Sequence, residues 1–194
     1  CTDGSKGSSD QDISSKELSK IRQEEQTRAG KVLGLKNIVF LNYEDSLLQP
    51  TLDLRRDIAR EIRRHQPDIV ICQYPMRNLD AHWGLGHPDH IAVGEATLSA
   101  IFPAARDRLT FPELLQEGFG PHKVSQLLVG DRSSGADTWI DVTDTIDVAI
   151  KALQQHKSQV TLEIANHNMR LWRSETGKPK NMVYAESFKG FSFR

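Results

Sequence analysis

The sequence has few cysteines, no excess of positive charge and no long apolar run. Its 194 residues include only two cysteines, Cys1 and Cys72, which is too few for a framework of disulfides. The formal net charge is −1, with acidic and basic residues interspersed, so no positive field favours nucleic acid or an anionic membrane. No apolar run approaches the roughly 20 residues of a membrane span, and no signal peptide is visible. We therefore expect no nucleic-acid partner, no membrane span and a reducing, cytoplasmic setting.

The chain does have enough apolar material for one core. Hydrophobic residues make up 38% of the 194, which suffices for a single buried core without a second domain. No internal repeat or low-complexity segment divides the sequence. We expect residues 1–194 to form a single domain, in which Cys72 is a small buried hydrophobe.

Short apolar runs alternate with amphipathic patterns along the chain. Residues 14–33 and 52–65 have apolar side chains at helical spacing, and 36–42 and 68–74 hold runs typical of buried strands. We interpret the row of arginines on the second of these helices as a solvated face. Further elements are expected in the less regular second half: strands at 123–129, 138–142 and 182–188, and helices at 143–159 and 161–173. This alternation predicts an α/β fold with a parallel sheet and right-handed crossovers.

The segment from Asp80 to His90 is the most informative part of the sequence. It places three histidines and two aspartates within eleven residues. Pro88 suits the first turn of a helix, where its missing N–H costs nothing, and helical apolar spacing follows it. On this helix His87 and His90 project to one side, with the carboxylate of Asp89 between them in sequence. Such a set can form part of a metal site or an acid–base site.

A structural alternative for this segment stays open. The histidines could serve only as helix caps and surface groups of a polar loop, and Asp80 could form a turn with Asn78. Capping needs only one small polar side chain, however, whereas histidine is an uncommon residue that occurs here three times. The composition of the segment therefore favours a functional site.

The pattern Asp-x-His-x-Gly-x-Gly-His-Pro-Asp-His in this segment resembles the signature of the PIG-L/LmbE-type zinc-dependent de-N-acetylases. Further elements of that family occur in its own order: a glycine-rich turn at 2–8, an Arg-x-x-Glu helix at 22–34, a His-x-Ser-Gln element at 156–159 and an Ala-Glu-x-Phe strand at 185–188. The resemblance is specific because order and spacing agree over most of the chain. It implies a Rossmann-like three-layer sandwich with a mostly parallel sheet.

The resemblance also implies an activity. Family members are hydrolases that remove an N-acetyl group from N-acetylglucosamine conjugates or related amides, using a zinc-bound water. Zn²⁺ is therefore the expected cofactor, although imidazole–carboxylate sites also accept iron, cobalt and nickel. The expected partner is a small amidosugar substrate, and a homo-oligomer is left open.

Individual residues acquire roles from the same resemblance. His90 matches a metal ligand, and His87 matches the catalytic histidine that stabilises the oxyanion or protonates the leaving amine. Asp89 is the candidate that holds His87 in the required tautomer and favours its charged form. The candidates for contacting the substrate, or for holding the residues that do so, are Asp80, His82, Arg22 and Glu25.

The amino terminus departs from the family pattern. The family's first strand ends in a motif of the type Ala-His-Pro-Asp-Asp, which supplies two zinc ligands and the catalytic carboxylate. This sequence begins at Cys1, without an initiator methionine, and contains no such motif. We therefore expect a domain that lacks its first strand and retains one of three metal ligands. The activity of the chain on its own is thereby put in question.

Other interpretations keep the same residues but change their use. A non-catalytic carbohydrate-binding or structural relative would have the fold without the zinc. An unrelated metallohydrolase would use Asp80, His82 and His90 as its own metal cluster. Arg22 and Glu25, three residues apart on a predicted helix, would form only an exposed salt bridge in the simplest interpretation.

Overall fold

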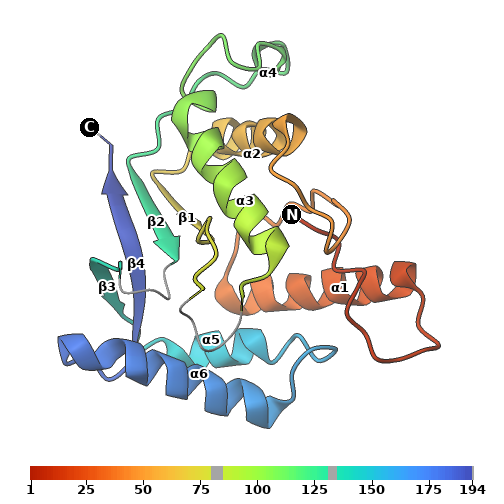
Figure 1. Cartoon of the computed structure of the whole chain (residues 1–194), viewed down its shortest axis with the longest axis vertical. Helices are drawn as coiled ribbons and strands as arrows, with labels where there is room; N and C mark the ends of the chain where they lie inside the picture. The colour runs from red at the N-terminus through yellow and green to blue at the C-terminus, as the bar shows by residue number, and fades with distance from the viewer. Residues whose placement is uncertain (80–84, 131–134, 194) are drawn as a thin grey trace. The chain divides into compact units, whose positions relative to one another are not determined.

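The structure is a computed structural model that describes residues 1–79, 85–130 and 135–193. These residues form six α-helices and four strands, which confirms the predicted α/β class (Figure 1). Within the described ranges, no helix combines the length and the apolar character needed to cross a membrane.

The chain forms two compact units, and each is described by itself. The first unit consists of Cys1–Asp45 and Trp139–Ser187. The second unit consists of Ser46–Thr138 and Phe188–Arg194. The segment with the paired histidines therefore lies in the second unit, and the glycine-rich turn near the amino terminus lies in the first.

The strands form a mixed sheet in the order β1-β2-β4-β3. Their bounds are Ile69–Cys72 for β1, Gln126–Gly130 for β2, Thr138–Asp141 for β3 and Ala185–Ser192 for β4. β1 pairs parallel with β2, which places Val70 opposite Leu127. β2 pairs antiparallel with β4, which places Leu128 opposite Gly190. Each of the four coincides in part with a predicted strand.

One predicted strand is wrong. Residues 36–42 lie outside the four strands, although they contain an apolar run. Next to this segment lies an isolated parallel bridge between Thr2 and Tyr43. The N–H of Asp3 donates to the carbonyl of Tyr43 at 2.8 Å, and the N–H of Tyr43 donates to the carbonyl of Cys1 at 3.1 Å. A strand needs a ladder of such bonds, which an apolar run alone does not specify.

The second unit is built around an apolar core between helices and sheet. Its helical elements are α2 (Leu52–His65), α3 (Pro88–Ser99), the π-helical turn η1 (Ala100–Ala104) and α4 (Glu113–Gln116). α2, α3 and η1 pack against one another, and α3 also contacts β1. Ala59 and Ile62 of α2 meet Ala104 of η1 and Leu127 and Val129 of β2 in this core. The apolar stripe predicted for α2 is therefore its buried face.

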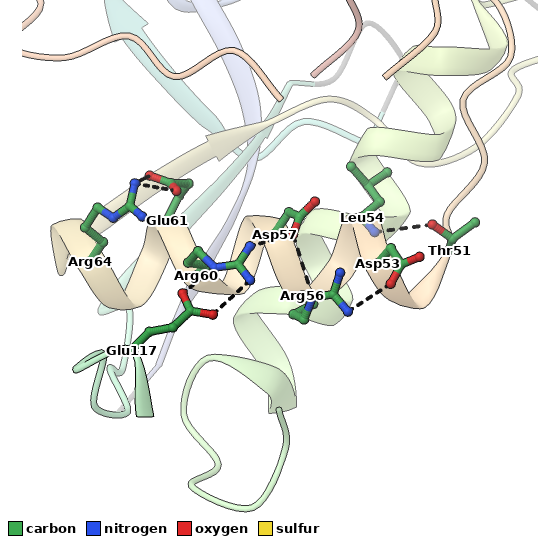
Figure 2. A network of polar contacts seen from close by, with 9 residues as sticks. All are labelled: Thr51, Asp53, Leu54, Arg56, Asp57, Arg60, Glu61, Arg64 and Glu117. Carbon is green, nitrogen blue, oxygen red and sulfur yellow. Dashed lines mark hydrogen bonds and ion pairs between the residues drawn. The ribbon is translucent and has the colours of Figure 1, made fainter. Parts of the chain in front are cut away.

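The outward face of α2 is a chain of ion pairs (Figure 2). The hydroxyl of Thr51 caps the helix by accepting the N–H of Leu54 at 3.2 Å. The pairs along the face are Arg56–Asp53, Arg56–Asp57, Arg60–Asp57, Arg60–Glu117 and Arg64–Glu61. Arg56, Arg60 and Arg64 are therefore paired with carboxylates, which confirms the interpretation of a solvated face for these three arginines. For Arg63 of the same helix the interpretation is wrong, because this side chain is 1% exposed.

The first unit contains three helices and a short 3₁₀ turn. They are α1 (Ser15–Leu33), α5 (Ile146–Leu153), α6 (Leu162–Gly177) and η2 (Lys178–Lys180). α1 starts with a reciprocal cap between Ser14 and Glu17 and ends at Gly34, whose φ of 71° is left-handed. The predicted range of 14–33 therefore agrees with the helix to within one residue. α5 packs against α1 and α6, and it ends at Leu153, so the predicted helix at 143–159 was too long.

Candidate active site

The start of α3 holds the two histidines of the candidate site in the second unit. His87 is the N-cap residue, with extended backbone (φ −72°, ψ 132°), and Pro88 occupies the first turn as predicted. The N–H of Asp89 donates to Nδ1 of His87 at 3.2 Å. Histidine therefore takes the capping role that the structural alternative assigned to it. Capping uses only one of its two ring nitrogens, so it does not replace a chemical role.

The capping bond occupies Nδ1 of the imidazole and leaves Nε2 available for other contacts. A ring nitrogen that accepts a hydrogen bond carries no proton, so the neutral ring of His87 has its proton on Nε2. The His87 side chain is exposed, and its ring centroid lies 5.3 Å from that of His90. The two imidazoles are thus neighbours on one side of the helix start, as their spacing predicted.

The carboxylate of Asp89 is directed into the protein. Asp89 is 4% exposed and accepts two main-chain hydrogen bonds, from Ser46 at 2.7 Å and from Leu48 at 3.2 Å. The contact with His87 comes from the main-chain N–H of Asp89. The ligand atoms of His87 and Asp89 nevertheless lie within 4.8 Å of each other. No sequence signal indicated the contact with residues 46–48, because a main-chain donor has no residue signature.

The loop before α3 is only partly described. Asp80 and His82, two of the residues predicted to contact substrate or support the site, lie outside the described residues. At the end of the loop, Arg77 donates to the carbonyls of Leu85 at 3.2 Å and Gly86 at 3.4 Å. Gly86 has a φ of 78°, a left-handed conformation that glycine adopts without steric cost.

In the first unit, Arg22 holds the glycine-rich turn near the amino terminus. Its guanidinium donates to the carbonyl of Gly4 at 2.8 Å, of Lys6 at 2.6 Å and of Gly7 at 3.1 Å. The same group lies 3.5 Å from the carboxylate of Asp45. A Cβ on Gly4 would approach the Arg22 side chain to 2.8 Å, so glycine permits the close contact. Arg22 therefore organises this turn through main-chain carbonyls.

Glu25 is buried and faces a segment far along the chain. It is 2% exposed and accepts hydrogen bonds from the N–H of Ser158 at 2.8 Å and from its hydroxyl at 2.7 Å. The interpretation of Arg22 and Glu25 as an exposed salt bridge is therefore wrong. Arg22 donates to main-chain carbonyls of the amino-terminal turn, whereas Glu25 accepts hydrogen bonds from Ser158. Ser158 belongs to the His-x-Ser-Gln element, so this contact joins two of the sequence elements that carried the family resemblance.

Comparison with known proteins bears directly on this arrangement. The family described as PIG-L, GlcNAc-PI de-N-acetylase, matches residues 1–101, more than half of the 194-residue chain, including α1 and the start of α3. The chain belongs to the PIG-L family. The resemblance found in the sequence is thereby confirmed.

Individual relatives of this PIG-L chain are similar over a larger part of it. Diacetylchitobiose deacetylase from Thermococcus kodakarensis is 29% identical, over 97% of the chain and 69% of the relative. A probable N-acetyl-alpha-D-glucosaminyl L-malate deacetylase 2 from Bacillus anthracis is 26% identical, over 74% of the chain and 58% of the relative. The solved structure of N,N'-diacetylchitobiose deacetylase from Pyrococcus horikoshii, complexed with its inhibitor MPG, matches with a TM-score of 0.87 and 26% identity. That match covers 98% of this chain and 70% of the other.

Proposed function

We propose that this chain is the major part of a metal-dependent hydrolase that removes an N-acetyl group from an N-acetylglucosamine conjugate or a related amide. The observation that carries the proposal is the start of α3, where His87 and His90 stand side by side within the region that matches the PIG-L family. The names of two relatives support the substrate class, since both are deacetylases of N-acetylated glucosamine compounds.

The donor set at the start of α3 fits a divalent metal. His90 is the proposed ligand, and it is an exposed imidazole on the first turn of the helix. His87, whose ring centroid lies 5.3 Å from that of His90, is assigned to the substrate, and the carboxylate of Asp89 accepts hydrogen bonds from the main chain of Ser46 and Leu48, so His90 is the one ligand assigned in this segment. Imidazole nitrogens and carboxylate oxygens are common zinc ligands, although iron, cobalt and nickel also accept them. When bound, zinc lowers the pKa of a coordinated water to about 7 and polarises a carbonyl.

The protein's own groups would then act on the acetamide. We assign to Nε2–H of His87 a hydrogen bond to the carbonyl oxygen, which becomes negatively charged as the amide is attacked. The bond from the main chain of Asp89 to Nδ1 keeps the ring in the tautomer that places its proton on Nε2.

The remaining residues predicted from the sequence have supporting roles in this proposal. We assign Asp80 and His82 to contacts with substrate, and Arg22 and Glu25 to the support of the loops that they hold. We also propose that residues 1–194 belong to one Rossmann-like domain whose complete sheet is mostly parallel. The 97% of the chain that aligns with diacetylchitobiose deacetylase supports a single domain.

Release of free amine from N,N'-diacetylchitobiose and from an N-acetylglucosaminyl conjugate tests the proposal. The assay compares this chain with a form extended upstream of Cys1, each with its His87→Ala variant. We expect turnover in the extended form and a loss of about 100-fold or more in kcat for His87→Ala. Full activity of the extended His87→Ala protein, or none in either form without the substitution, would contradict the proposal.

A further inference from the structure

In the part of the chain that the structure describes, the carboxylate of Asp89 accepts hydrogen bonds from main-chain groups of the second unit and not from the imidazoles. Its two hydrogen bonds among the described residues come from the main-chain N–H groups of Ser46 and Leu48. Those donors lie 43 and 41 residues away in sequence, so the contact is tertiary. With 4% of Asp89 exposed, the carboxylate depends on these donors to replace water.

The conformation of Ser46 shows why such an anchor is needed. Its φ is 67°, in the left-handed region that residues with a Cβ rarely occupy without support. The bond from its N–H to Asp89 is the shorter of the two, at 2.7 Å. Leu48 is 7% exposed and fixes the far end of the segment, whereas Leu47 between them is 64% exposed. Residues 46–48 therefore form a turn held at both ends with its middle side chain facing outward.

The main chain of the same residue reaches the candidate catalytic group. The N–H of Asp89 donates to Nδ1 of His87, while its carboxylate holds the turn at 46–48. Asp89 also lies in the first turn of α3, where the unpaired N–H groups and the helix dipole favour a negative charge. One residue thus joins three features: the left-handed turn, the helix start and the orientation of the imidazole.

We infer that Asp89 is a positioning residue, whose buried carboxylate fixes the turn at residues 46–48 against the start of α3. The consequence for catalysis rests on the proposed function: substitution of Asp89 acts on turnover through this turn, rather than through a contact of the carboxylate with the imidazole of His87. The anchoring itself is a property of the fold and is present whether or not the protein deacetylates anything.

Hydrogen exchange of individual amides tests the anchor without any assay of activity. In Asp89→Asn, an amide NH₂ replaces one acceptor oxygen, so at least one of the two bonds is lost. We expect the exchange of at least one of the two amides, Ser46 or Leu48, to rise at least tenfold. The matched control is Asp53→Asn, because Asp53 holds the same position in the first turn of α2 but is exposed and paired with Arg56. That control leaves both amides protected.

Two substitutions at Ser46 test the same turn from its other end. Valine is strongly disfavoured at positive φ, whereas glycine adopts it freely. Ser46→Val is therefore expected to raise exchange at Leu48 at least tenfold and to lower kcat/KM by the same factor as Asp89→Asn. Ser46→Gly keeps kcat/KM and the protection at Leu48. Since Ser46 is exposed, neither change disturbs the core, and the pair stays informative if Asp89→Asn fails to fold.

The outcomes separate this inference from the proposed function. Unchanged exchange at Ser46 and Leu48 in Asp89→Asn overturns the inference, whatever happens to activity. A loss of turnover in Asp89→Asn that Ser46→Val does not share overturns it as well, because the carboxylate would then act elsewhere. Faster exchange in a protein that has no deacetylase activity supports the anchor and removes only the proposed function.

Discussion

The buried carboxylate of Glu25 accepts two hydrogen bonds from Ser158, one from its N–H at 2.8 Å and one from its hydroxyl at 2.7 Å. The two residues are 133 positions apart, and both belong to the first unit. The contact ties α1 to the turn that follows α5. A buried charge of this kind is stable only while its donors are in place.

We expect Ser158→Ala to lower the free energy of unfolding by about 1–2 kcal/mol, and Glu25→Gln to lower it by about 2–3 kcal/mol. In a double-mutant cycle measured by urea unfolding, the two changes should couple by about 1 kcal/mol. Glu24→Gln is the control, because Glu24 is exposed on the same helix and should change stability by less than about 0.5 kcal/mol. Strictly additive effects at Glu25 and Ser158 would show that the contact is not formed.

Substitution of Arg63 should also lower the free energy of unfolding strongly. It is 1% exposed and donates to the carbonyls of Ala104, Ala105, Asp107 and Thr110. Burial lowers the pKa of this guanidinium. Lysine cannot reproduce the planar set of donors, so Arg63→Lys should cost about 2–4 kcal/mol in urea unfolding. Arg64→Lys, on the solvated face of α2, should change stability by less than about 0.5 kcal/mol, and equal effects at the two positions would contradict the account.

Asp137 makes the stability of the second unit depend on pH. The N–H of Gly190 and, next, the ammonium of Lys189 lower the pKa of Asp137 from 3.8 to about 2. Because the pKa in the folded state is the lower one, the contribution is present above about pH 4 and is lost as the pH falls towards 2. Urea midpoints measured between pH 6 and 2.5 should fall less steeply in Asp137→Asn than in the unsubstituted protein. Lys189→Met, which removes the contribution of the ammonium and keeps that of Gly190, should give an intermediate slope.

The two cysteines should differ sharply in reactivity. Cys72 packs against the core of the second unit, and burial raises the pKa of its thiol to about 11. Cys1 is exposed. Since the thiolate is the reactive form, we expect a disulfide reagent at pH 8 to label one thiol per chain quickly and Cys72 at least 100-fold more slowly. Peptide mapping of the labelled protein identifies the thiol, and rapid labelling of Cys72 would show that β1 is not packed as described.

Local signals account for what could be predicted from the sequence. The ends of α1 follow from the side chain of Ser14 and the left-handed Gly34, and both lie within one turn of the helix. The start of α3 follows in the same way from Pro88. In each case the sequence and the structure agree because the determining contact is local.

What could not be predicted depends on partners distant in sequence. The apolar run at 36–42 resembles a strand, but pairing requires a neighbour that the run itself does not specify. Arg22 and Glu25 have the spacing of a helical salt bridge, yet each is drawn to a tertiary partner, in the amino-terminal turn and at Ser158. The anchoring of the turn at residues 46–48 by Asp89 belongs to the same class, because its donors are main-chain groups.

Zinc content measured together with amine release tests the central claim most directly. The proteins to compare are the chain extended upstream of Cys1 and its His90→Ala and His65→Ala variants, since His65 is a surface residue at the end of α2. The account predicts bound zinc, and deacetylation that a chelator abolishes and added zinc restores, in the unsubstituted protein and in His65→Ala. In His90→Ala both should fall by about 100-fold or more. Zinc and turnover in His90→Ala equal to those of the unsubstituted protein would contradict it.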